Sequence, residues 1–281
     1  MYENFRLLES ENKLVGYQWE ISQPLAVVCL IHGIGEHAGR YDRIGEAFKK
    51  AGIAMVGMDL RGHGLSSGKR GHTAPRKEIL GDIDLLLLDI QKKYPEVPVF
   101  LYGHSMGGNI ALDYRRRGRY RTVPKAYLIT SPWILLQRKI PSYLYRFCKM
   151  LSKIKPDFQM NSKIEPSDLG NIGIISKQEH SELVHGKISV QTAVEGIEIA
   201  EALMNSQLEI IGEEPLRPFL LMHGSADKVC NPEGSRIIAR LEKDLCQYVE
   251  WKGLYHEIHN GSPNSDGTEV IREMIDWMKK S

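Results

Sequence analysis

The sequence predicts an α/β fold in which a mostly parallel central sheet is flanked by helices and carries a helical cap insertion. Along most of the chain, apolar runs typical of strands buried on both faces alternate with amphipathic, helix-like segments. The length of 281 residues is sufficient for one such domain with an insertion. The alternation stops between Trp133 and Glu214 and then resumes, which predicts a core of residues 1–132 and 215–281 and a cap of residues 133–214.

The N-terminal half begins with two β-prone runs, residues 4–8 and 13–21, which predict an antiparallel hairpin. Four apolar runs of strand length follow and predict buried strands at residues 25–31, 53–58, 97–102 and 126–130. Between them, apolar residues recur at helical spacing, which predicts helices at residues 40–51, 78–94 and 106–117. Gly52 and Pro95 stand where the first two of these helices should end.

The C-terminal part repeats the alternation, with strands expected at residues 219–222 and 247–251 and helices at 233–243 and 268–280. Strands that alternate with helices in this way form a parallel sheet with right-handed crossovers. The intervening cap segment shows amphipathic helical stretches and loops but no good buried strand. One stretch, residues 140–154, has an apolar stripe that either packs on the body or forms a lid.

Composition and charge exclude several functional classes. Hydrophobic residues make up 42% and charged residues 26% of the chain, which argues against disorder. The net charge is only +2 and no helix-turn-helix or zinc-finger spacing is present, so we expect no nucleic-acid partner. Neither a signal peptide nor a membrane-spanning run is visible, and the four scattered cysteines fit reduced thiols, so we expect a cytoplasmic protein. We expect the arginine run at 115–121 to be solvated, where it offsets a helix dipole.

A G-x-S-x-G pattern lies at the junction of a predicted buried strand and the helix that follows it. It reads Gly103-His104-Ser105-Met106-Gly107. In such an elbow the strand turns so sharply that only small residues fit beside the serine. The turn presents the serine hydroxyl and directs the first amides of the helix at the group that it attacks. The pattern also arises by chance in a chain with 26 glycines, so its place between strand and helix is what makes Ser105 the candidate nucleophile.

A serine nucleophile needs an imidazole to take its proton and a carboxylate to orient the imidazole. In an open parallel sheet these groups belong in loops at the carboxyl ends of strands. Asp227 and His256 follow the last two predicted strands, and the order Ser, Asp, His is the one that this fold imposes. Alone, each would pass for an ordinary turn or loop residue. Because the competing base His259 lies further from the strand end, we predict Ser105, Asp227 and His256 as the catalytic residues.

An oxyanion hole needs two backbone amides. Met106, the residue after the nucleophile, should supply one, and Ile34, in the glycine-rich turn after the first long buried strand, should supply the other. The identity of the Ile34 side chain matters little because the backbone makes the contact. This mechanism implies no metal and no organic cofactor.

Four segments carry a family resemblance: residues 32–41 (HGIGEHAGRY), 59–66 (DLRGHGLS), 103–108 (GHSMGG) and 224–227 (GSAD). Together they resemble the monoacylglycerol lipase family, an α/β-hydrolase group that also contains lysophospholipase-like enzymes and general carboxylesterases. The resemblance covers nearly the whole chain and is weakest in the cap segment. Residues 59–66 depart in detail from some members, and we interpret them as a strand-end turn without a catalytic role.

The resemblance implies that Glu36, Arg40 and His259 line the polar end of the substrate pocket, where a glycerol head group would sit. In the alternative interpretation, Glu36 and Arg40 only cap the first helix. Cys230 stands three positions after Asp227, so it is either a pocket-side thiol or a core residue.

We therefore expect a serine hydrolase that cleaves lipid-type carboxylic esters through an acyl-enzyme. The resemblance favours monoacylglycerol as substrate, giving fatty acid and glycerol. The alternatives are an aryl or feruloyl carboxylesterase, a lysophospholipase, or a non-catalytic ligand-binding protein that has kept this fold. The intact Ser105, Asp227 and His256 argue against the last of these. The expected partner is a small lipid or another apolar ester, and the cap would touch a membrane surface transiently.

Overall fold

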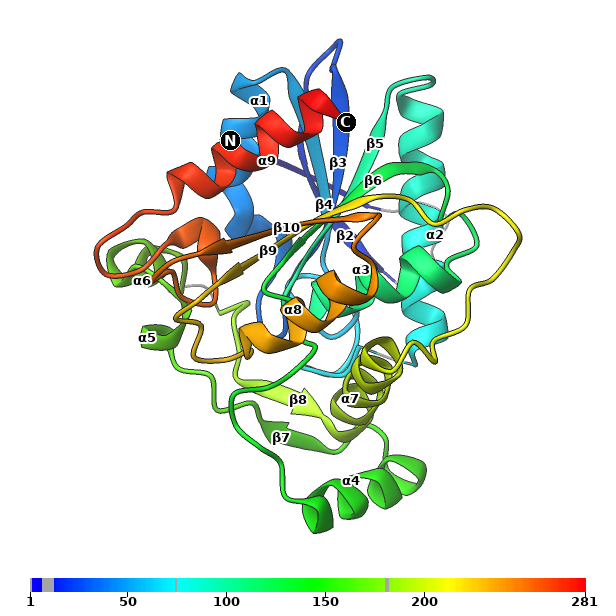
Figure 1. Ribbon diagram of the computed structural model, residues 1–281, viewed down its shortest axis with the longest axis vertical. Helices are drawn as coiled ribbons and strands as arrows, with labels where there is room; N and C mark the ends of the chain where they lie inside the picture. Colours follow the sequence, from blue (N-terminus) through cyan, green and yellow to red (C-terminus); the bar gives the residue numbers. More distant parts are fainter. Residues whose placement is uncertain (1, 7–12, 74, 180–181) are drawn as a thin grey trace.

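A single eight-stranded sheet forms the centre of the computed structural model, which describes residues 2–6, 13–73, 75–179 and 182–281. Its strand order is β1-β2-β4-β3-β5-β6-β9-β10 (Figure 1). The strands are β1 (Glu3–Arg6), β2 (Val15–Trp19), β3 (Ala26–Ile31), β4 (Ile53–Met58), β5 (Val99–His104), β6 (Pro124–Thr130), β9 (Phe219–Gly224) and β10 (Cys246–Trp251). From β4 to β10 every neighbouring pair is parallel, so the predicted mostly parallel sheet is confirmed.

The N-terminal strands form the antiparallel part of this sheet. β1 pairs with β2, and β2 pairs with β4, both in antiparallel register. The pairing agrees with the predicted hairpin, and residues 7–12, which include its predicted turn at 9–12, lie outside the described residues.

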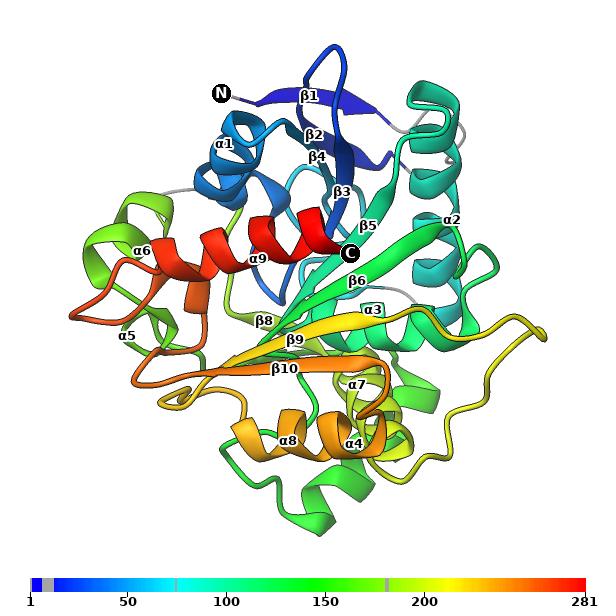
Figure 2. The same cartoon turned by 45° about the horizontal axis from the view of Figure 1, so that its top comes forward.

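Helices cover both faces of the sheet (Figure 2). They are η1 (Ala38–Tyr41), α1 (Asp42–Lys50), α2 (Arg76–Lys93), α3 (Met106–Arg117), α8 (Pro232–Leu241), η2 (Ile258–Asn260) and α9 (Thr268–Lys280). Because successive strand residues point to opposite faces, Val28 and Leu30 share an apolar cluster with α1 and α9, whereas Val27 and Cys29 share one with α2, α3 and α8. The two clusters are the two halves of the core.

The carboxyl ends of five parallel strands meet at one edge of the sheet. The register pairs Ile31 with Gly103, His104 with Thr130, and Gly224 with Trp251. β5 runs two residues beyond its predicted end at residue 102, because the first glycine of the elbow and the histidine after it still pair with β6. The loops after these strands are therefore neighbours in space.

The segment from 133 to 214 holds four helices and a small second sheet within its described residues. They are α4 (Ser142–Ile154), β7 (Gln159–Asn161), α5 (Pro166–Leu169), α6 (Ile172–Glu179), β8 (Lys187–Ser189) and α7 (Val190–Met204). The helical character agrees with the prediction, but the antiparallel pair of β7 and β8 was not expected. Strands of three residues are too short to leave a periodic signal. In Figure 1, α4 lies at the end of the molecule, away from the central sheet.

The expectation that the arginine run at 115–121 is solvated is wrong for three of its members. Arg115, Arg116 and Arg121 are all buried. Arg115 Nη1 and Arg116 Nη2 lie 2.6 and 3.0 Å from the two carboxylate oxygens of Glu242, and the Arg115 guanidinium stands 4.5 Å from the ring centroid of Phe219. The flat, five-donor guanidinium finds acceptors from distant parts of the chain, which the local sequence does not reveal.

All four cysteines are free thiols, in agreement with the prediction. Cys29 lies in β3, and Cys246 is the first residue of β10. Among the described helices, none combines the length and the apolar composition needed to cross a membrane.

Candidate active site

Ser105 occupies a strained turn between β5 and α3. Its backbone has φ 54° and ψ −117°, a conformation that costs free energy for any residue with a side chain. A Cβ atom on Gly107 would lie 2.0 Å from the Ile31 carbonyl oxygen, and one on Gly103 would lie 2.3 Å from the Gly107 carbonyl oxygen. Both glycines are therefore required by close backbone approach, which is the predicted geometry of the elbow.

The structure brings Ser105, His256 and Asp227 together at the carboxyl edge of the sheet. The Ser105 hydroxyl donates a hydrogen bond to His256 Nε2 over 2.8 Å, and His256 Nδ1 donates to Asp227 Oδ2 over 2.7 Å. Asp227 lies in the loop after β9 and His256 in the loop after β10, and all three side chains are buried. Because Asp227 Oδ2 is an acceptor, the imidazole proton lies on Nδ1 and leaves Nε2 free to accept the serine proton.

Burial and mutual interaction together set the charges of the Asp227 carboxyl and the His256 imidazole. Burial raises the pKa of the Asp227 carboxyl, but His256 and His223 beside it hold that pKa well below its ordinary value. Burial lowers the pKa of His256, yet the charge and hydrogen bond of Asp227 outweigh it and raise that pKa above its ordinary value. An ionised carboxylate next to a basic imidazole is the arrangement that activates a serine hydroxyl.

The amides of Ile34 and Met106 are both available to an oxyanion. Met106 is the first residue of α3, so its N–H has no partner within the helix. Neither amide donates a hydrogen bond elsewhere in the part of the chain that the structure describes. A Cβ atom on Gly33 would lie 3.2 Å from Ser105 Cβ, so the turn that carries Ile34 lies directly beside the candidate nucleophile.

The orientation of the Ile34 amide is fixed from two sides. The Leu60 amide donates to His32 Nε2 over 2.9 Å, so the proton of the His32 ring is on Nδ1, which donates to the Gly33 carbonyl oxygen over 2.7 Å. The Gly33 amide donates to Glu36 Oε1 over 2.5 Å. The bond to the Gly33 carbonyl orients the peptide plane between Gly33 and Ile34, whose N–H points opposite to its carbonyl, and the bond from the Gly33 amide holds the preceding peptide of the same turn.

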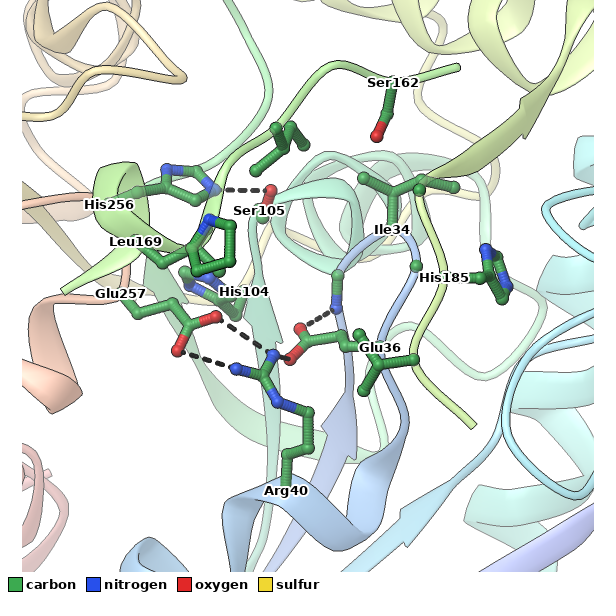
Figure 3. A pocket seen from close by; sticks show the side chains of 16 residues that line it. Ile34, Glu36, Arg40, His104, Ser105, Ser162, Leu169, His185, His256 and Glu257 are labelled. Carbon is green, nitrogen blue, oxygen red and sulfur yellow. Dashed lines mark hydrogen bonds and ion pairs between the residues drawn. The ribbon is translucent and has the colours of Figure 1, made fainter. Parts of the chain in front are cut away.

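Glu36, Arg40 and Glu257 form a buried ionic cluster beside the serine (Figure 3). Arg40 Nη1 lies 2.6 Å from Glu36 Oε2 and 3.0 Å from Glu257 Oε1. Burial lowers the pKa of the Arg40 guanidinium, but the two carboxylates together raise it above its ordinary value. Glu36 and Arg40 thus do more than cap a helix. Glu257 was not predicted, although a carboxylate directly after the candidate base is a signal that the sequence offers.

Two cavities meet at Ser105. The first, of about 270 Å³, contains His104, His256 and the three residues of the ionic cluster beside the apolar residues Ile164, Pro166, Leu169 and Val184; as the more polar of the two it is called the polar cavity. The second, of about 330 Å³, is lined mainly by apolar side chains: Trp133, Leu136, Ile140, Leu144, Met160, Ile188 and Ile197. Ile34 and Ser105 line both cavities, whereas His256 lines only the first.

Glu36 and Arg40 line the polar cavity as expected, but His259 is not among its lining residues. The His259 ring stacks on Tyr41, with the ring centroids 5.2 Å apart, and stands edge-on to His104. It therefore supports the wall of the cavity from behind. His185, from the segment between α6 and β8, lines the cavity and was not predicted.

Cys230 combines the two roles that the sequence left open. Its side chain is buried in the core, and it also lines the apolar cavity. Burial, together with the nearby charge of Asp227, raises the pKa of the thiol well above its ordinary value. A thiol that stays protonated is a weak nucleophile.

Known proteins share this architecture. The family described as serine aminopeptidase, S33, matches residues 22–263. The monoglyceride lipase of Rattus norvegicus is 30% identical over 91% of this chain and 82% of its own length. An uncharacterised abhydrolase domain-containing protein of Dictyostelium discoideum is 31% identical over 92% of this chain, which spans only 27% of that protein.

A solved structure leads to the same group. The monoacylglycerol lipase of Paleococcus ferrophilus superposes with a TM-score of 0.81 at 29% identity, covering 96% of this chain and 98% of its own. The superposition and the strand order of this chain indicate the same fold, and the turn at Ser105 has the geometry of the elbow. The chain therefore belongs to the serine aminopeptidase S33 family, with the α/β-hydrolase fold, and it is a serine hydrolase of carboxylic esters.

Proposed function

We propose that the enzyme hydrolyses monoacylglycerols to fatty acid and glycerol. The observation that carries this proposal is the position of Ser105 at the junction of a polar and an apolar cavity. A monoacylglycerol has the same division, because its polar glycerol and its apolar acyl chain meet at one ester bond. The relatives named monoglyceride or monoacylglycerol lipase support the same substrate class.

The geometry also supports one direction of substrate binding. In this mechanism Ser105 attacks the ester carbonyl, His256 takes the serine proton, and the amides of Ile34 and Met106 hold the oxyanion. His256 then returns the proton to the departing alcohol, so the alcohol must lie on the side of the imidazole. Since His256 lines only the polar cavity, the glycerol belongs there and the acyl chain belongs in the apolar cavity. Water then releases the acyl group through the same imidazole.

The ionic cluster favours an uncharged polyol over two other classes of head group. Its two carboxylates, Glu36 and Glu257, outnumber the single guanidinium of Arg40, so a phosphate-bearing lysophospholipid meets repulsion at this end of the cavity. Arg40 engages both carboxylates, so a substrate ammonium would have to compete with a fixed guanidinium for them. Hydroxyl groups can donate to the remaining carboxylate lone pairs without either cost.

Residues 133–214 act, in this proposal, as a cap that meets the lipid surface. Tyr143, Phe147, Met150 and Ile154 of α4 are exposed and form one apolar face. Four exposed cations are among the residues that line the apolar cavity: Arg138, Lys139, Lys163 and Lys228. An apolar helix face next to basic residues is suited to the boundary of an anionic membrane. The four free thiols fit the cytoplasmic location that we expect from the sequence.

Labelling with a fluorophosphonate tests the nucleophile. We expect the wild-type enzyme to be labelled and Ser105→Ala to lose both labelling and ester hydrolysis. Ser142→Ala, which alters an exposed serine at the start of α4, serves as the control and should behave as wild type. A wild-type enzyme that remains unlabelled would contradict the proposed mechanism.

A substrate panel tests the specificity separately. Initial rates should be highest for monoacylglycerols, measured from short to long acyl chains, and lower for diacylglycerol, lysophospholipid and feruloyl esters. A preference for feruloyl esters over every glyceride would overturn the lipase proposal while leaving the nucleophile intact. A preference for lysophospholipid would contradict the argument from the ionic cluster.

A further inference from the structure

Asp227 Oδ2 accepts hydrogen bonds from two imidazoles. One is His256 Nδ1 at 2.7 Å, and the other is Nε2 of His223, the penultimate residue of β9, at 2.9 Å. The Nε2 atom of His223 faces only acceptors, since the Cys230 carbonyl oxygen lies 3.3 Å away, so Nε2 carries a proton. On the far side of the ring, Ser235 Oγ of α8 lies 2.7 Å from His223 Nδ1.

We propose that His223, held by Ser235, is a positioning residue that fixes the Asp227 carboxylate for its work with His256. The chain of contacts then runs from Ser235 through His223, Asp227 and His256 to Ser105, and every side chain in it is buried. The inference rests on the proposed roles of Ser105, His256 and Asp227 and adds a residue to them.

The Asp227 carboxylate needs a second hydrogen-bond donor at its Oδ2 atom. Its Oδ1 atom accepts the amides of Val229 and Cys230 at 2.7 and 2.9 Å, which anchors one oxygen to the backbone. The Oδ2 atom has no backbone donor in the described chain, and its two partners are the imidazoles. His256 must become charged and then neutral again in each cycle, so a second donor keeps Oδ2 in place while that bond changes strength.

The hydrogen bond from His223 to Asp227 also limits the basicity of His256. A hydrogen bond from His223 takes up part of the negative charge on Oδ2, so the carboxylate stabilises the His256 imidazolium less than it otherwise would. Glu250 of β10, which pairs with His223 in the strand register, is held instead by Arg236 and Tyr248. Loss of the His223 donor should therefore raise the pKa of His256 and move the acid limb of activity to higher pH.

The test compares His223→Leu with His223→Gln, whose side-chain amide can still donate toward Oδ2. Steady-state hydrolysis of a short-chain monoacylglycerol and the rate of fluorophosphonate labelling are measured across pH on the full chain. We expect His223→Leu to lower kcat by about tenfold to a hundredfold, the effect of losing one hydrogen bond to a charged group, with little change in KM. Its acid limb should shift to higher pH, and His223→Gln should restore most of the rate.

A second variant keeps the proposal testable if His223→Leu does not fold. Ser235→Ala removes only the hydroxyl that orients the ring, and we expect a smaller loss of kcat with a shift in the same direction. A folded His223→Leu with the wild-type pH profile, or a His223→Gln enzyme as impaired as His223→Leu, would overturn the inference. If wild type is unlabelled or Ser105→Ala stays active, it is the proposed mechanism that fails, so the two failures are distinguishable.

Discussion

His256 Nδ1 donates a hydrogen bond to Asp227 Oδ2 over 2.7 Å, and both side chains are buried. Burial alone would make this imidazole a weak base, but the neighbouring carboxylate reverses the direction of the pKa shift. The pair links two loops that follow adjacent parallel strands, and under the proposed mechanism it would set how activity depends on pH.

Asp227→Asn should shift the pH profile in the direction opposite to the shift expected for His223→Leu. Hydrolysis needs neutral His256, so wild-type kcat/KM should fall as the pH drops through a pKa that lies above the ordinary histidine value of about 6.5. Asp227→Asn removes the group that raises this pKa and leaves burial, which lowers it. We expect its acid limb at lower pH and kcat reduced by roughly 10⁴-fold, measured with a soluble ester. An unchanged acid limb in Asp227→Asn would contradict the assignment.

The elbow should not tolerate a methyl group at Gly107. The added Cβ would lie 2.0 Å from the Ile31 carbonyl oxygen, and that atom is backbone that cannot move aside cheaply. We expect Gly107→Ala to lose fluorophosphonate labelling and to unfold at lower urea concentration. Gly81→Ala is the matched control, because a Cβ atom there meets nothing within 4 Å. Since alanine is the better helix former, Gly81→Ala should be neutral or stabilising by up to about 1 kcal/mol.

Removal of the Arg40 guanidinium should be costly for stability. Arg40→Met leaves Glu36 and Glu257 buried without their cation, and breaking a buried pair from one side costs about 3–5 kcal/mol. Arg240→Met is the control, because its ion pair with Glu233 is exposed and should contribute less than about 1 kcal/mol. Urea unfolding measures both. If Arg40→Met is as stable as Arg240→Met, the cluster does not hold this part of the fold together.

The exposed face of α4 should determine binding to lipid surfaces. Tyr143 and Phe147 are 76% and 54% exposed, so replacing both with serine removes apolar surface at little cost to the folded state. We expect the double variant to sediment less with vesicles of anionic phospholipid. Leu241→Ser, which changes a 49% exposed leucine on α8, should bind vesicles as wild type does. Equal loss in both proteins would indicate non-specific binding, and no loss in either would contradict the proposed membrane contact.

The local parts of the site were predictable because short-range geometry decides them. Glycines at 103 and 107 frame a serine where an apolar run ends, and the backbone contacts of both glycines require that arrangement. Strands buried on both faces leave continuous apolar runs in the sequence. These runs predicted the parallel sheet and the positions of Asp227 and His256 after strand ends. The short strands β7 and β8 were not predicted, because three residues are too few to show an alternation of apolar and polar side chains.

The sequence by itself thus determined the sheet and the elbow, since these depend on apolar periodicity and on residues within a few positions of each other, and it placed the predicted reacting groups at strand ends. Tertiary structure alone decided which side chains share a cavity. Arg40 reaches Glu257 across 217 positions, His259 stands behind the cavity wall, and Arg115 and Arg116 are buried against the distant Glu242. Such contacts depend on how separate loops pack above the sheet. Residues that are far apart in the sequence produce no local pattern from which their contact could be predicted.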